Sequence, residues 1–282
     1  MTTTPSSTSI KELSLSLLDA SLNDEQVKIA IDQIHVHFQN CIGLSGSETD
    51  LHRNAAVNTE YGKALGLTHA AQCLLDYKRT RFFLGGLYAA IRQKQIENPG
   101  KQIQVFYAGC GPYAPFFTLV APLFEVSEVR YSILDINMES VRFATELIEK
   151  LGLSSYINEY HQADAITFKI PNAADCDILF SETSDALLYR ECYVPILCNM
   201  IPQLSDRAIV IPENVQIKMS FVRQDEKGQQ TEDTPKVVFD SRETAKASRE
   251  MARLPDSFPP KKVPIDRNSN IKALVLDTEV HV

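Results

Sequence analysis

Hydrophobic residues follow two different spacings along the chain, and the change of spacing divides it into three parts. From Asn23 to residue 42, apolar residues recur at three- and four-residue steps, which predicts an amphipathic helix. The preceding Ser9-Ile10-Lys11-Glu12 has the form of a capping box and predicts the start of a leucine-rich helix. Residues 1–8 are expected to be disordered and the polar stretch 43–60 to be a loop. Residues 1–60 are therefore predicted to form a helical N-terminal cap.

The middle of the chain alternates short apolar runs with helical patterns. A long helical region is predicted from 62 to 95, where Asn98-Pro99-Gly100 follows and stops it. Beyond it the pattern predicts strands at 102–108, 129–134, 157–162, 175–181 and 207–212, and helices at 113–121, 138–151 and 186–200. Strands that alternate with helices of this length indicate a parallel sheet with helices on both faces. The predicted fold class is α/β, with a doubly wound, mostly parallel Rossmann-like sheet in a domain over residues 61–213.

After Pro212 the apolar residues change to a two-residue spacing. Strands are predicted at 215–221, 237–239 and 271–282, with a polar loop at 224–236. A helix at 243–253 and a proline-rich stretch at 255–264 are predicted between the last two strands. Residues 214–282 are therefore expected to be a short antiparallel β addition that contacts a substrate or a partner.

Composition narrows the class of protein. The 282 residues carry a net charge of −8 without a long run of Lys or Arg, which disfavours nucleic acid and favours cationic substrates. No signal peptide and no apolar run of membrane-spanning length is apparent, so a soluble cytoplasmic protein is expected. Six cysteines without a CxxC pair indicate reduced thiols rather than zinc ligands or disulfides. His35 and His37 point to different faces of a helix, so no metal site is predicted.

Candidate cofactor residues follow three consecutive predicted strands. Gly109 and Gly111 lie where a strand turns into a helix, and a residue without a Cβ lets a ligand approach the backbone there. Asp135 ends the next strand and is expected to accept hydrogen bonds from ribose hydroxyls; the alternative is an N-terminal cap on the following helix. Asp164 and Ala165 follow the third strand and are predicted to lie near an adenine, although a solvated loop also fits Asp164.

Two kinds of cofactor suit these residues, a dinucleotide or S-adenosylmethionine. A dinucleotide needs amide donors at the helix N-terminus for its pyrophosphate. Here Pro112 removes one donor and Tyr113 takes the place of the third glycine of a dinucleotide motif. The substitutions favour S-adenosylmethionine, which carries no phosphate.

The segment 177–191 resembles the acidic double-E loop of protein arginine methyltransferases. The likeness lies in the apolar strand, in Ser181-Glu182 at its end, and in the spacing to Glu191. Two flanking segments are similar to motifs of the same family, Asp76-Tyr77-Lys78-Arg79-Thr80 with His69 upstream, and Ile209-Val210-Ile211-Pro212-Glu213. The resemblance covers residues 61–220 and implies a class I S-adenosylmethionine-dependent methyltransferase.

Carried over residue by residue, the resemblance implies a role for each matching position. Glu182 and Glu191 would hold a guanidinium or amine, and Arg79 would pair with the carboxylate of the cofactor. The cofactor would also contact Gly109, Gly111 and Asp135. It would contact Tyr107 as well, which stands where the family's loop begins with an acid. Tyr61 is a further candidate, an aromatic residue closing over the site. Other interpretations are a carboxylate at a helix N-terminus for Glu182 and a solvated helix residue for Glu191.

The proposed chemistry agrees with these residue types. A guanidinium stays protonated at physiological pH, so one nitrogen becomes nucleophilic only where the cation is held and polarised. Two converging carboxylates do this through charge-assisted hydrogen bonds. Positioning that nitrogen in line with the methyl group supplies much of the remaining rate. The resulting prediction is an N-methyltransferase acting on a guanidino or amino group.

Departures from the family pattern change the expected acceptor. Thr183-Ser184-Asp185 replace apolar and aromatic residues between the two glutamates, and the chain has no tryptophan for the family's Thr-His-Trp loop. About 70 residues follow Pro212, fewer than the family's full barrel and dimerisation arm need. A small molecule is therefore expected as the acceptor in preference to protein arginine, and an oligomer is possible.

Two alternative functions remain open at this level. The first is methyl transfer to oxygen or carbon, with Asp185, His69 or His161 as general base. The second is a catalytically silent binding partner that kept the fold, which Tyr107 and the missing tryptophan favour and the retained acidic residues oppose.

Overall fold

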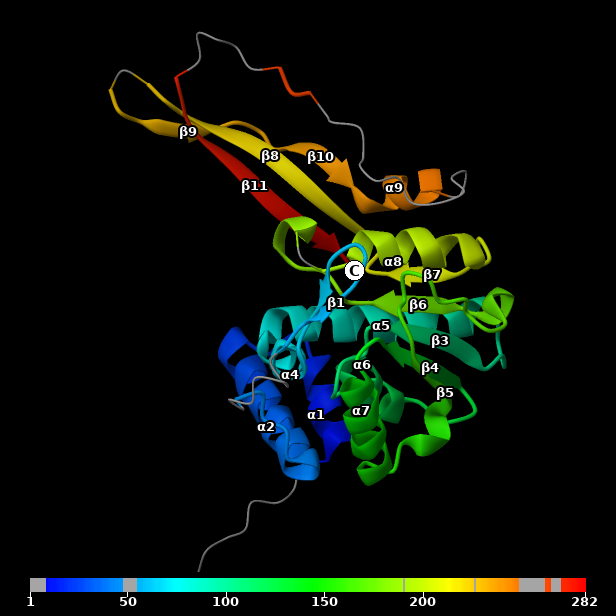
Figure 1. Cartoon of the computed structure of the whole chain (residues 1–282). Helices are drawn as coiled ribbons and strands as arrows, with labels where there is room; N and C mark the ends of the chain where they lie inside the picture. Colours follow the sequence, from blue (N-terminus) through cyan, green and yellow to red (C-terminus); the bar gives the residue numbers. More distant parts are fainter. Residues whose placement is uncertain (1–8, 48–54, 190, 226, 249–261, 265–269) are drawn as a thin grey trace, which may run out of the picture.

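The computed structural model describes residues 9–47, 55–189, 191–225, 227–248, 262–264 and 270–282. Its centre is a five-stranded sheet, all of whose neighbouring strands run parallel, in the order β5-β4-β3-β6-β7 (Figure 1). The strands are β3 (Ile103–Ala108), β4 (Val129–Asp135), β5 (Ile157–Gln162), β6 (Ile178–Ser181) and β7 (Ile209–Ile211). The predicted Rossmann-like sheet is confirmed, with each strand within three residues of its predicted bounds.

Alternate residues of the strands face opposite layers of helices. On β3, Val105 and Tyr107 belong to one buried cluster, whereas Phe106 and Ala108 belong to the other. The first cluster contains side chains of α1 (Ile10–Leu17), α2 (Asp24–Ile42), α5 (Tyr77–Glu97), α6 (Pro115–Thr118) and α7 (Met138–Lys150). The second contains side chains of α8 (Tyr193–Met200) and α9 (Ser241–Ser248). Helices thus cover both faces, as the doubly wound prediction requires.

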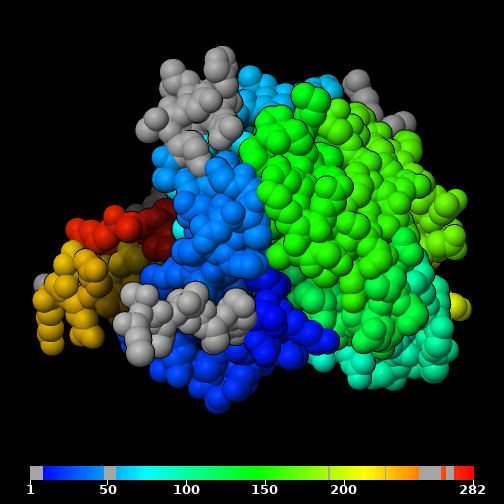
Figure 2. Space-filling model, turned by 90° about the horizontal axis from the view of Figure 1, so that it is seen from below, coloured from blue at the N-terminus to red at the C-terminus, as the bar shows by residue number. Residues whose placement is uncertain are grey.

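The N-terminal helices pack into the same core as the sheet. Ser9 closes the predicted capping box with Glu12 at the start of α1, and Asn23 caps α2. The predicted apolar face of α2, including Ile31 and Phe38, is fully buried. Figure 2 shows these helices, in blue, directly against the green surface of the α/β unit. The segment predicted to be disordered, residues 1–8, lies outside the described residues.

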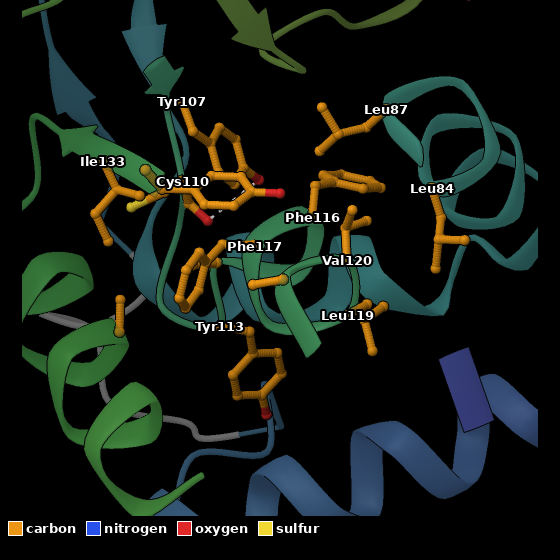
Figure 3. Packing of buried hydrophobic residues seen from close by; sticks show 14 of the residues in the cluster. Leu84, Leu87, Tyr107, Cys110, Tyr113, Phe116, Phe117, Leu119, Val120 and Ile133 are labelled. Carbon is orange, nitrogen blue, oxygen red and sulfur yellow. Dashed lines mark hydrogen bonds between the residues drawn. The ribbon is translucent and has the colours of Figure 1, made fainter. Parts of the chain in front are cut away.

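Aromatic side chains fill the layer between the sheet and α5. Tyr107 and Phe116 both pack against Phe180, with ring centroids 5.0 and 4.9 Å apart. Figure 3 shows Phe116 close to Tyr107 and to Leu87 of α5. Such pairs bury large apolar areas and prefer tilted or edge-to-face geometry. This layer supports the end of β3 from which the glycine turn begins.

Proline residues shorten two of the predicted helices. The helix predicted at 113–121 is reduced to α6 and a 3-10 turn at Ala121–Leu123, each with a proline in its first two positions. The helix predicted at 186–200 begins only at Tyr193, which puts Pro195 in its first turn. Proline is tolerated in a first turn but breaks a helix interior. The long helical region predicted at 62–95 contains no proline but is also divided, into β2 (Lys63–Ala64), α4 (Leu67–Gln72), a 3-10 turn (Cys73–Leu75) and α5.

A second sheet projects from the α/β unit (Figures 1 and 2). It consists of β8 (Asn214–Gln224), β9 (Gln230–Glu232), β10 (Lys236–Asp240) and β11 (Ile271–His281), all paired antiparallel. β8 and β11 pair along their whole length, from Ile271 with Arg223 to His281 with Asn214. The antiparallel addition is thus confirmed, although β9 falls in the stretch predicted to be a loop. The predicted helix residues 249–253 and most of the proline-rich stretch 255–264 lie outside the described residues.

All six cysteines are free thiols. Within the described ranges, no helix is long and apolar enough to cross a bilayer. In the same part of the chain, no group of three or more His, Cys, Asp or Glu side chains is arranged to hold a metal ion. The domain boundaries predicted after residues 60 and 213 stay predictions.

Candidate functional site

Four segments that follow parallel strands meet at one edge of the central sheet. Ala108 of β3 pairs with Leu134 of β4 and with Ser181 of β6, and β4 pairs in turn with β5. The residues at the ends of these four strands are therefore brought together. The sheet continues away from β3 in both directions, with β4 on one side and β6 on the other. The strand order thus reverses its direction at β3. In open α/β sheets, a crevice opens at the carboxyl ends of the strands where this reversal occurs.

A cavity of about 850 Å³, including the solvent at its mouth, occupies this edge. All nine site residues predicted from the sequence line it. They are Arg79, Tyr107, Gly109, Gly111, Asp135, Asp164, Ala165, Glu182 and Glu191. The structure therefore brings the predicted residues together, while their individual roles stay predictions.

The glycine turn has a backbone that only glycine adopts without strain. Gly109 and Gly111 have φ values of +76° and +63°. A Cβ on Gly109 would lie 2.2 Å from Cγ2 of Thr183, whereas the nearest atom to a Cβ on Gly111 is 3.8 Å away. The turn is also bound to β4, because the amides of Gly109 and Cys110 both donate to the carbonyl of Leu134. It is thus packed closely against the loop that carries Glu182.

Asp135 is a buried hydrogen-bond acceptor at the floor of the cavity. One carboxylate oxygen accepts from the amide of Gly111 and the other from the amide of Asn137, both at 2.8 Å. Burial raises its pKa to about 6 against the effect of these two donors. The alternative of a helix cap is wrong, because the side chain of Asn137 caps α7. Asp135 instead connects the glycine turn to β4 and lines the cavity.

Asp164 and Ala165 lie on the loop after β5. Asp164 accepts from the amide of Ile166 at 2.9 Å, a local turn that any loop aspartate can form. Ala165 is buried in the second hydrophobic cluster. Both line the cavity, so the loop interpretation fits Asp164, and the predicted place of both residues near an adenine stays a prediction.

Arg79 and Glu182 form a buried ion pair inside the cavity. Nε of Arg79 contacts a carboxylate oxygen of Glu182, and the side chains are 24% and 9% exposed. The guanidinium also donates to the carbonyls of Glu182 at 2.8 Å and Ser184 at 3.4 Å. Burial raises the pKa of Glu182, Arg79 lowers it, and Glu191 raises it further. Arg79 therefore holds the start of the acidic loop, and its predicted pairing with a cofactor carboxylate stays a prediction.

Glu191 lies at the other end of this loop, just before α8. Its amide donates to Asp185 at 3.4 Å, and its side chain lines the cavity. Burial raises the pKa of Glu191 to about 7, with Arg79 opposing the rise and Asp185 adding to it. The alternative of a solvated helix residue is wrong, because Glu191 is partly buried and precedes the helix. The alternative interpretation of Glu182, a carboxylate at a helix N-terminus, is also wrong, because α8 begins eleven residues later.

Tyr107 lines the cavity but belongs mainly to the aromatic layer. Its side chain is 1% exposed, and its hydroxyl donates to the carbonyl of Cys110 at 3.5 Å. The hydroxyl therefore binds the glycine turn itself. Contact between Tyr107 and a cofactor stays a prediction.

A short hairpin that the sequence did not indicate covers part of the cavity. β1 (Val57–Asn58) lies in the stretch predicted to be a loop, and it pairs antiparallel with β2 (Lys63–Ala64), where the prediction of a helix from residue 62 is wrong. Thr59 and Lys63 of this hairpin line the cavity, and Oγ1 of Thr59 lies 3.0 Å from Sγ of Cys192. Strands of two residues are too short to show a hydrophobic spacing in the sequence, so the hairpin was not predicted. Its partner Cys192 directly follows Glu191, which was predicted to belong to the site.

Several candidate residues lie elsewhere. No histidine is among the described residues that line the cavity. His69 is an exposed residue of α4, and His161 packs against Phe106 and Phe168. Tyr61, 40% exposed at the tip of the hairpin, is also not among the lining residues. Asp185 lines a neighbouring groove with Asp76, Phe82 and Thr278.

Comparison with known proteins gives distant structural likenesses. No protein-family model and no curated protein matches the sequence. The chain is similar to the PRMT1 enzyme–prozyme heterotetrameric complex of Trypanosoma brucei with AdoHcy, at 16% identity and a TM-score of 0.43, over 54% of this chain and 44% of that one. It is also similar to protein arginine methyltransferase 10 of Arabidopsis thaliana in an open conformation, at 14% identity and a TM-score of 0.40, over 52% and 39%. The matched region covers less than half the length of each of these two methyltransferase chains.

Proposed function

We propose that the protein is an S-adenosylmethionine-dependent N-methyltransferase that acts on a guanidino or amino group. The observation that carries the proposal is the meeting of Glu182 and Glu191 with the glycine turn and Asp135 in one cavity. The residues suit the cofactor, because Gly109 keeps the cavity wall free of a Cβ and Asp135 is a buried acceptor beside it. When bound, S-adenosylmethionine supplies a methyl group on a positively charged sulfur.

The residues of the chain supply the rest of the chemistry. Glu182 and Glu191 hold the cation of the acceptor and draw its charge away from the nitrogen that is to be methylated. That nitrogen gains a methyl group and loses a proton. Burial raises the pKa of Glu191 to about 7, which suits a carboxylate that receives this proton near neutral pH.

A nitrogen acceptor suits the cavity better than an oxygen or carbon acceptor. The three residues considered as general base for an oxygen or carbon acceptor, Asp185, His69 and His161, are not among the described lining residues. Two carboxylates in a partly buried cavity instead favour a cation. We infer a small guanidino or amino compound in preference to protein arginine, because polar Thr183-Ser184-Asp185 stand between the glutamates.

Calorimetric titration followed by product analysis tests the proposed function. Wild-type protein is titrated with S-adenosylmethionine and then incubated with methyl-labelled donor and agmatine, free arginine or an arginine-rich peptide. We expect donor binding and labelled N-methylguanidine, with more product from the small acceptors. No heat of binding at high micromolar donor contradicts the proposal. Binding without any methylated product supports a silent binding protein instead.

Donor binding is expected to weaken as the pH falls through 6. Burial raises the folded-state pKa of Asp135 to about 6, so a ribose acceptor that is ionised at pH 7 becomes protonated at pH 5. Protonation removes the charge-assisted hydrogen bond, and the Kd rises by up to about tenfold per pH unit below 6. Titration at pH 5, 6 and 7 measures the effect.

The matched control for this pH dependence is Asp135→Asn. This variant is expected to bind the donor weakly at all three pH values, because its amide does not ionise. An unchanged Kd for the wild type between pH 7 and pH 5 would remove Asp135 from the predicted ribose contact.

A further inference from the structure

The loop between Glu182 and Glu191 contains an uncommon backbone. Leu187 and Leu188 have φ values of +60° and +54°, in the left-handed region that branched and bulky residues avoid. Each such residue costs on the order of 1–3 kcal/mol and persists only where surrounding contacts hold it. Within the loop, the amide of Leu188 donates to the carbonyl of Asp185 at 3.0 Å, and Leu188 packs against the second hydrophobic cluster. The amide of Leu187 finds its acceptor outside the loop.

The second sheet supplies a contact to the turn. The amide of Leu187 donates to Oγ1 of Thr278 on β11, at 2.7 Å and across 91 residues of sequence. β11, in red, runs beside this loop in Figure 1. The ends of the loop are held separately, because Arg79 donates to the carbonyls of Glu182 and Ser184 and the amide of Glu191 donates to Asp185. Thr278 thus contacts the loop at its strained middle.

β11 is itself fixed at this point. Val280 and Val282 pack against the hydrophobic core, and the carbonyl of His281 accepts from the amide of Glu213 at 2.7 Å. A Cβ on Gly86 of α5 would lie 2.1 Å from Cγ1 of Val282, which shows how closely the end of the chain approaches that helix. Thr278 lies between this anchored end and the projecting part of the sheet. A hydroxyl on a fixed strand orients a loop better than a contact from a mobile segment does.

We propose that Thr278 is a positioning residue for the acidic loop: its hydroxyl holds the Leu187–Leu188 turn and thereby sets Glu191 against Glu182. The proposal rests on the proposed function, because the two glutamates are taken to hold the acceptor. It gives the second sheet a role in the active site without contact with the reacting atoms. The groove beside the loop, which Thr278 and Asp185 both line, would change shape with it.

The experiment compares Thr278→Val, which keeps the shape and removes the acceptor, with Thr278→Ser, which keeps the hydroxyl. The control is Thr231→Val, an exposed threonine of β9 in the same sheet. Amide exchange of Leu187 is followed by NMR, donor affinity by titration, and methyl transfer with labelled donor and agmatine. In Thr278→Val we expect Leu187 to exchange up to about tenfold faster. We also expect kcat to fall about ten- to a hundredfold with an unchanged donor Kd.

Thr278→Ser and Thr231→Val are expected to match the wild type in all three measurements. An unchanged exchange rate of Leu187 in Thr278→Val, or an unchanged kcat, overturns the proposal. A failure of the proposed function is visible separately, as wild-type protein that gives no methylated product. In that case the catalytic part of the proposal falls with it, and the exchange rates still decide whether Thr278 holds the turn.

Discussion

Replacing Glu182 with glutamine is expected to lower kcat for methyl transfer by about 10²–10³-fold, the usual cost of removing one preorganised charge contact. Glutamine keeps the shape of the side chain and one oxygen in contact with Arg79, but the guanidinium loses its counter-charge. The negative charge that holds the acceptor cation is lost. Donor affinity is expected to stay within about threefold, since the ribose and glycine contacts are untouched.

The matched control for this substitution is Glu213→Gln. Glu213 follows β7 at the same edge of the sheet, but it is exposed and is not among the residues that line the cavity. We expect it to retain wild-type turnover with labelled donor and agmatine. Normal turnover in Glu182→Gln would remove the proposed pair of glutamates, whereas loss of turnover in both variants would point to the edge of the sheet in general.

The position of the site was predictable because apolar strands end in residues that do not belong in a core. Gly109, Asp135 and Glu182 each follow a short apolar run, whereas Asp164 follows a more polar strand. Parallel strands place the residues after their ends at one edge. The sequence alone therefore indicated a shared site. It did not indicate the pairing of Arg79 with Glu182, because an arginine on a helix has several partners within reach and only packing selects one.

The loop between the glutamates was the least predictable part. A helix at 186–200 fits the apolar spacing, yet α8 begins at Tyr193 and the leucines before it are left-handed. Pro195 was the local signal for the later start, since proline favours the first turn of a helix. The left-handed leucines had no such signal, because a contact with Thr278, 91 residues away, holds them. Long-range contacts of this kind override local propensity.

The second sheet illustrates the same limit in a different way. Two-residue alternation predicted β8 and β11, and the pairing of these two long strands confirms it. Their placement against α5 depends on Val282 meeting a helix position without a side chain, Gly86. A glycine inside a helix costs about 1 kcal/mol relative to alanine, so close approach of another segment is a physical reason for its presence. The sequence shows the glycine but not its neighbour.

Replacing Gly109 with alanine is expected to cost about 2–5 kcal/mol in the free energy of unfolding and to abolish measurable donor binding. Two effects combine. Alanine pays about 1–2 kcal/mol at a φ of +76°, and its Cβ would lie 2.2 Å from Cγ2 of Thr183, an overpacking that costs about 1–3 kcal/mol. Because Thr183 follows Glu182, relieving the clash moves the acidic loop as well as the glycine turn.

Two further variants separate these effects in denaturant unfolding and donor titration. Gly100→Ala has a φ of +81° with no atom within 4 Å of the new Cβ, so it is expected to show the backbone cost alone and to leave donor binding unchanged. Gly109→Ala combined with Thr183→Ser removes the clashing methyl group and keeps the hydroxyl that lies 3.1 Å from Ser181. We expect this pair to recover the overpacking part of the loss. Equal losses in Gly109→Ala with and without Thr183→Ser would show that the clash with Thr183 does not limit the turn.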